Sequence, residues 1–155
     1  MKSLSYAFSS SRKPAPAPPF EPSARRIKVS LHDLVNSLLS TLQPLAMKRN
    51  NIVLNGIPQG LCFVAEENVL AYVLWNMIST VINNKNNECI HVQVLVEDHR
   101  TMICVKNAGT YIYKALDYRK LQDAAETIGG CIDLYNDDTY GNNLVFSICN
   151  SRMAV

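Results

Sequence analysis

The most reactive side chains of this sequence are its five cysteines, which lie at Cys62, Cys89, Cys104, Cys131 and Cys149. No two of them form a Cys-x-x-Cys pair, whereas a metal site needs thiolates or imidazoles that converge at short spacing. Most lie in apolar, strand-like runs, so we expect buried, reduced thiols. The histidines are also scattered, because His91 alternates out of a strand and His99 falls in a turn. They give no Ser/His/Asp or Cys/His arrangement.

A glycine turn is the other stretch that suggests chemistry. Residues 104–113 read CVKNAGTYIY, which is typical of a strand end followed by a tight turn. The turn resembles a nucleotide-binding corner from which the most important acid is missing. The chain therefore either binds a nucleotide or keeps only the shape of a protein that did.

Size and composition limit the remaining function classes. The chain has 155 residues, 48% of them hydrophobic, and a formal charge of +2, which fits one domain with a core plus a tail. This weak charge, without a basic cluster beside aromatic residues, argues against a nucleic-acid partner. No run reaches the roughly 18 apolar residues of a membrane span, and the first residues lack the apolar centre of a signal peptide. We expect a cytoplasmic protein with no membrane partner.

The first 26 residues differ in composition from the rest. The run SSSRKPAPAPPFEPSARR alternates Pro with Ala, which supports neither a helix nor a sheet ladder. We expect residues 1–26 to form a disordered, Pro-rich tail, either a simple linker or a ligand for a proline-reading module. Residues 27–150 form the folded domain, and residues 151–155 are expected to fray.

Periodicity predicts the elements of this domain. Helical spacing of apolar residues indicates helices that begin after Ser30, a good N-cap, and after Glu66, with Pro44 expected to kink the first of them. A third helix is expected from Leu116 to Ile128, ended by the Gly129–Gly130 pair. Strands are expected at 27–29, 52–54, 61–64, 90–96, 101–106, 131–135 and 144–149.

The order of these elements predicts the fold class. Strands come in hairpins with helices between them, so the helices should gather on one face of a mixed, mostly antiparallel sheet. The sequence therefore predicts an α+β two-layer sandwich. Trp75 lies on the second helix, whose wide apolar stripe indicates deep burial, so we expect Trp75 in the core.

Three stretches together resemble the ATP-binding domain of sensor histidine kinases and its GHKL relatives (gyrase, Hsp90, histidine kinase, MutL). LWNMISTVIN looks like the family's N box, and VKNAGT looks like its first glycine box. LQDAAETIGGCIDLYNDDTYGNNLVFSI looks like its last helix, glycine turn and closing hairpin. The likeness runs from about Lys28 to Asn150 and implies the same sandwich fold.

The resemblance assigns six remnant nucleotide-site residues, and most depart from the family pattern. In the N box the first Asn matches Asn76, the Mg²⁺-holding Asn falls on Thr80, and the following basic residue falls on Asn83. In the glycine box the adenine-binding acid falls on Asn107, the first glycine is Gly109, and Tyr111 replaces the second. About a dozen residues without glycine separate Gly109 from Leu121, so the phosphate-binding lid does not fit.

These losses imply a degenerate, lid-less domain. Each hydrogen bond to a charged group contributes about 1.5–3 kcal/mol, so losing two or three removes several factors of ten in affinity. We therefore expect no catalytic residues, no cofactor and no enzyme activity. The implied role is a protein-interaction or regulatory module in two-component-like signalling, with a kinase or response regulator as partner.

Two alternatives stay open. The first is a functional ATP–Mg²⁺-binding domain of a small histidine or anti-sigma-type protein kinase, in which Asn76, Thr80 and Asn107 still hold the nucleotide. The second is a homodimer formed through the first helix. The pair His32–Asp33 looks superficially like a phosphoacceptor box, but it lies at the start of the sandwich's own first helix. We expect it to be polar and exposed.

Overall fold

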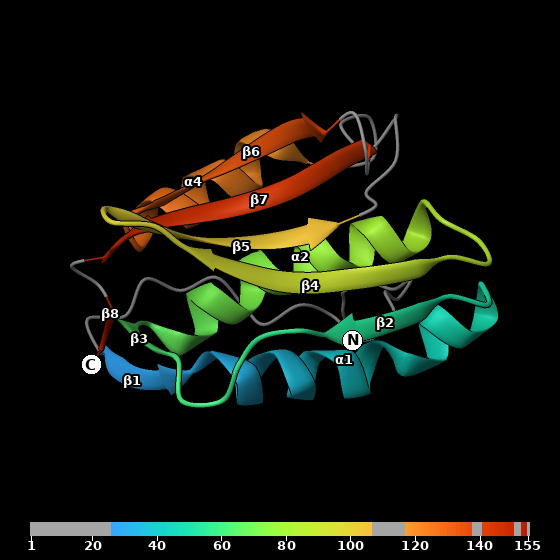
Figure 1. Ribbon diagram of the computed structural model, residues 1–155, viewed down its shortest axis with the longest axis horizontal. Coiled ribbons are helices and arrows are strands. Elements are labelled where there is room, and N and C mark those ends of the chain that lie inside the picture. Colours follow the sequence, from blue (N-terminus) through green and yellow to red (C-terminus); the bar gives the residue numbers. More distant parts are fainter. Residues whose placement is uncertain (1–25, 107–116, 138–140, 151–152, 155) are drawn as a thin grey trace, which may run out of the picture.

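The computed structural model describes residues 26–106, 117–137, 141–150 and 153–154. Two sheets and one layer of helices make up this part of the chain (Figure 1). The larger sheet has the strand order β2-β4-β5-β7-β6, in which only β2 and β4 are parallel. The predicted α+β sandwich with a mixed, mostly antiparallel sheet is therefore confirmed.

The five strands of the larger sheet follow the predicted segments closely. They are β2 (Ile52–Asn55), β4 (Cys89–Val96), β5 (Arg100–Lys106), β6 (Gly130–Asp137) and β7 (Gly141–Cys149). Apolar side chains on β4, β5 and β7 alternate between the two faces of the sheet, as a pleated strand requires. Ile90, Ile103 and Phe146 are fully buried on the face that carries the helices.

The smaller sheet has the order β1-β3-β8, with strands Ile27–Ser30, Cys62–Ala65 and Met153–Ala154. We expected residues 151–155 to fray, but Met153 pairs with Phe63 and Ala154 with Cys62. The sequence gives no sign of this pairing, because it joins segments about ninety residues apart.

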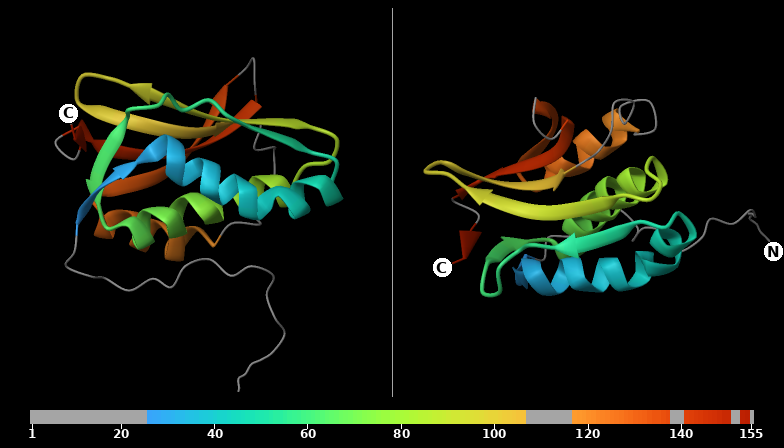
Figure 2. Two further views of the ribbon diagram at one scale, coloured as in Figure 1. Left: turned by 90° about the horizontal axis from the view of Figure 1, so that it is seen from below. Right: turned by 45° about the vertical axis from the view of Figure 1, so that its right-hand side comes forward.

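The helices of the described chain are α1 (Leu31–Lys48), α2 (Glu67–Asn83) and α4 (Tyr118–Thr127). They lie together on one side of the larger sheet (Figure 2), with α2 packed between α1 and α4. Ser30 caps α1 as predicted, since its Oγ accepts from the Asp33 N–H at 3.4 Å. Pro44 does not end α1, which continues to Lys48.

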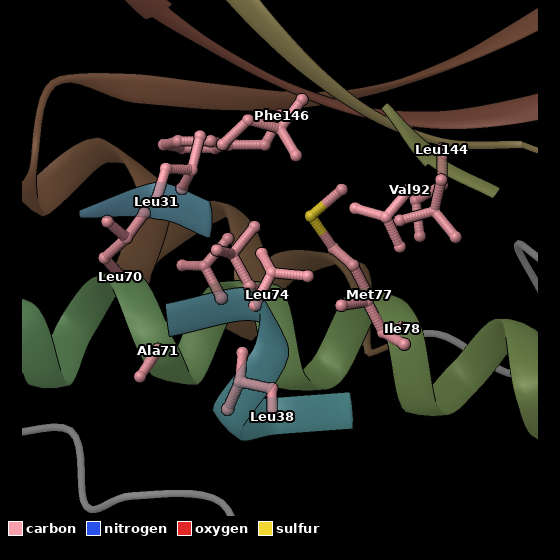
Figure 3. Close-up of a cluster of buried hydrophobic side chains, with 14 of the residues drawn as sticks. Leu31, Leu38, Leu70, Ala71, Leu74, Met77, Ile78, Val92, Leu144 and Phe146 are labelled. Atoms are coloured by element: carbon pink, nitrogen blue, oxygen red, sulfur yellow. The ribbon is translucent and has the colours of Figure 1, made fainter. Parts of the chain in front are cut away.

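The core lies between the helices and the sheet. Leu74 and Met77 of α2 meet Val92, Leu144 and Phe146 of the sheet there (Figure 3). Trp75 is only half-buried and packs against this cluster from its edge. Tight packing continues to Gly130, where an added Cβ would lie 2.3 Å from the Phe146 ring. Gly129, at φ 82°, makes the predicted turn after α4.

A buried asparagine joins α1, α2 and β4. The Asn51 Nδ2 donates to the carbonyls of Ile82 and Lys85, and its Oδ1 accepts from the Glu88 N–H. Beside it, Asn50 and Asn87 both adopt a φ of 57° and share a side-chain hydrogen bond of 2.7 Å. This cluster fixes the end of α1 against the loop that leads into β4.

Candidate functional site

The residues of the predicted N box lie on one side of α2. Asn76 and Thr80 are four residues apart, so they share a face of the helix, and both are half-buried. Asn83 is the last residue of α2 and is exposed. The structure therefore brings Asn76 and Thr80 together and leaves Asn83 in solvent.

Both N-box side chains donate to their own helix. The Asn76 Nδ2 donates to the Tyr72 carbonyl at 2.7 Å, and the Thr80 Oγ donates to the Asn76 carbonyl at 2.5 Å. A hydroxyl bonded to the carbonyl of the preceding turn lies flat along the helix and does not extend toward a ligand. The Thr80 oxygen keeps its acceptor lone pairs but is held close to the helix, and the Asn76 Oδ1 is the acceptor on the longer side chain of the pair.

The predicted glycine box begins where β5 ends. This strand stops at Lys106, directly before Asn107, and it packs against α2. Asn107, Gly109 and Tyr111 themselves lie outside the described residues. The structure thus places the N box beside the strand that leads to the glycine box.

His32 has a structural role that the sequence did not predict. Its Nδ1 lies 2.6 Å from the Ile57 carbonyl, which can only accept, so Nδ1 donates. Its Nε2 lies 3.0 Å from the Asn36 Nδ2 and accepts from it. We expected an exposed ring, but His32 is half-buried and holds α1 to the segment after β2. With both nitrogens occupied, it is poorly placed as a phosphoacceptor.

The cysteines differ from the prediction in burial. All five are free thiols, but none is buried: Cys89 and Cys149 are exposed and the other three are intermediate. Four of the five alternate with core residues along β4, β5, β6 and β7, so they lie on the face of the sheet away from the helices. In the described ranges, no three His, Cys, Asp or Glu side chains are grouped to hold a metal ion.

Burial sets the protonation of two of these thiols. It raises the pKa of Cys104 above its ordinary value, with a smaller opposing effect from Lys106. It also raises the pKa of Cys131, together with the neighbouring Asp133 carboxylate. Both are therefore neutral thiols at physiological pH.

The fold is that of histidine kinase ATP-binding domains. The catalytic domain of histidine kinase ThkA superposes with a TM-score of 0.67 at 16% identity, over 81% of this chain and 96% of that one. The cytoplasmic segment of histidine kinase QseC gives a TM-score of 0.60 at 13% identity, over 81% and 78% of the two chains. Full-length ShkA, solved in complex with AMPPNP, gives 0.66 at 12% identity, over 81% of this chain and 31% of that one.

Sequence comparison adds nothing to this assignment. No protein-family model matches the chain, and no curated protein matches it significantly. Identities of this size show the fold alone. None of the helices in the described ranges has both the length and the apolar character needed to span a membrane.

Proposed function

We propose that this chain is a histidine kinase-type ATP-binding fold that no longer uses nucleotide and acts as a protein-interaction module. The observation that carries the proposal is the Thr80 hydroxyl. At the position where the resemblance requires an Mg²⁺-holding amide, this shorter side chain bonds to the Asn76 carbonyl of its own helix. Mg²⁺ demands near-ideal octahedral oxygen ligands, and the Asn76 Oδ1 beside a hydroxyl held to its own helix is a poor start for such a site.

The second N-box loss weakens phosphate binding further. Asn83 replaces a basic residue and is exposed at the end of α2. The described residues of α2 therefore offer no cation to a triphosphate. The intact core above the same helix supports a role that needs the shape of the domain and not its chemistry.

Equilibrium titration with a fluorescent ATP analogue and Mg²⁺ tests this proposal. We expect no saturable binding below about 100 µM, because several charge-assisted contacts are missing. The matched variant is Thr80→Asn combined with Asn107→Asp, which restores both family side chains. Saturable binding by the wild-type chain, abolished by Asn76→Ala with the fold intact, would establish the ATP–Mg²⁺-binding alternative.

The partner is a second part of the proposal. We expect a histidine kinase or a response regulator, since the solved structures that share this fold are of histidine kinases. Cross-linking in the source cell, with the full chain and with a variant that lacks residues 1–26, identifies the partner and separates a tail ligand from a domain ligand. Recovery of nucleotide-loaded protein alone would argue against an interaction module.

A further inference from the structure

The face of the larger sheet that points away from the helices is not an ordinary solvent-facing surface. Alternation along β5 sends Ile103 and Val105 into the core and Met102 and Cys104 to this outer face. The strand register sets Met102 beside Leu95 and Ser147, and Cys104 beside Gln93 and Val145. An apolar strip therefore crosses the centre of the outer face.

A pocket of about 350 Å³ lies on this strip. Three of its lining residues are buried, namely Met102 at 7%, Asn143 at 9% and Val145 at 2% exposure, and none of them belongs to the core cluster. Cys104 adds a neutral thiol. The volume is at the lower end of the range for binding sites, which is roughly 300–1,000 Å³.

The floor of this outer pocket contains a polar atom without a partner. Among the described residues, two side-chain oxygens are buried with no hydrogen-bond partner: the Asn143 Oδ1, which lines the pocket, and the Ser147 Oγ, which lies farther along β7 on the same outer face. Each such atom costs about 1–3 kcal/mol of desolvation. A protein tolerates this cost more readily where a bound group supplies the missing bond.

The rim of the outer pocket is cationic and partly apolar. Arg100 and Lys106 are the charged residues that line it, and Leu95 and Tyr135 stand at its edge with exposures of 51% and 41%. Arg100 is paired with Glu97 at 3.1 Å, but both side chains are almost half exposed. Such a pair contributes little and exchanges readily for a carboxylate from outside.

We propose that the outer pocket is a docking site for an acidic segment of another protein, which inserts one apolar side chain between Arg100 and Lys106. This inference rests on the proposed role as an interaction module and names the surface and the partner chemistry. The apolar anchor covers Met102 and Val145. A backbone N–H group of the same peptide segment faces the Asn143 side-chain oxygen, Oδ1. Flanking carboxylates pair with the two cations.

The same features argue against other occupants. A second copy of this chain would meet its partner through the same patch, because two-fold interfaces are isologous. That packing would bring two cationic rims together. A small ligand needs a site that encloses most of its surface, whereas this pocket is open to solvent beside the exposed Leu95.

A random-peptide phage library selected on the full chain provides the probe. We expect enrichment of peptides in which a Leu, Phe or Trp stands next to Asp or Glu. A synthetic peptide of the enriched sequence is then titrated by fluorescence anisotropy. Amide shifts in NMR spectra should map its binding to β5 and β7.

Two charge changes at the rim test the location. We expect Lys106→Glu and Leu95→Glu each to weaken peptide binding by about tenfold or more. Matched controls lie on the helical layer: Lys120→Glu reverses an exposed cation, and Met47→Glu replaces an apolar side chain that is 67% exposed. These controls should change affinity by less than roughly twofold. Circular dichroism confirms that each variant is folded, and Arg100→Gln serves as a second, milder rim variant.

Several outcomes would overturn the inference. They are enrichment of basic peptides, absence of enrichment, and equal affinity for the rim variants and the controls. A wild-type dimer in light scattering that becomes a monomer in Leu95→Glu would assign the face to a second copy. Nucleotide binding in the ATP titration would overturn the proposed function and leave the peptide result standing. The two failures are therefore distinguishable.

Discussion

The N-box side of α2 and the outer face of the sheet differ in where their polar side chains bond. On α2, the donors of Asn76 and Thr80 are used by carbonyls of the same helix. On the outer face, Asn143 and Ser147 bury oxygen atoms that have no partner among the described residues. The N-box donors are thus satisfied within α2, whereas the unmet bonding capacity lies on the outer face of the sheet.

The prediction with the largest expected effect on stability compares the substitution of two methionines, one on each side of the sheet. Met77→Ala, below the N box and 0% exposed, should lower the free energy of unfolding by about 2–5 kcal/mol, because it leaves a closed cavity. Met102→Ala, in the floor of the outer pocket, should cost less than about 2 kcal/mol, because its void joins an open pocket. Urea unfolding measures both. Equal losses in the free energy of unfolding would mean that the floor of the outer pocket is packed like a second core and is not a binding surface.

A smaller effect comes from two buried hydroxyls. Ser147→Ala should raise the free energy of unfolding by about 1 kcal/mol, because it removes a desolvated oxygen without a partner. The control is Thr101→Val, which should lower it by a similar amount, since the Thr101 Oγ donates to the Asn150 Oδ1 at 2.7 Å. Thermal and chemical unfolding follow both variants. A loss of stability in Ser147→Ala would show that the Ser147 hydroxyl is satisfied in solution.

The smallest effect is a dependence on pH. The pKa of Cys104 is raised above its ordinary value of 9.0 by burial, so the folded chain holds a proton that the unfolded chain releases. Its contribution to stability is complete below that value and is lost as the pH rises through the folded pKa. Between about pH 8 and pH 10, the free energy of unfolding should therefore fall less in the Cys104→Ala variant than in the wild-type chain. If the free energy of unfolding, measured under reducing conditions, depends on pH equally in both proteins, burial does not raise the pKa of Cys104.

Local signals in the sequence predicted local structure well. Ser30 and Gly129 mark helix ends because a capping oxygen and a positive φ act within a few residues. The sandwich itself followed from periodicity and element order. Long-range contacts were not predictable in this way, as with Met153 on β3 and the bond from the His32 ring to the Ile57 carbonyl.

The candidate site was predicted unevenly. The spacing of Asn76 and Thr80 placed them on one face of α2, but no sequence signal says that their donors bond to the helix. The expectation of a buried thiol at Cys104 overlooked a signal that was present. Cys104 alternates with Ile103 and Val105, so strict period-two counting assigns it to the other face of the sheet.

One detail of α4 bears on how any partner can approach. The Ile132 N–H on the edge strand β6 donates to the Gln122 Oε1 at 2.7 Å, and the Tyr118 hydroxyl donates to the Ile132 carbonyl. An open sheet border is a template for strand addition and aggregation, and these two side chains occupy the backbone donor and acceptor of Ile132. A strand from a partner cannot pair with this residue of β6 without displacing Gln122 and Tyr118, which favours contact with the outer face of the sheet over strand addition at this edge.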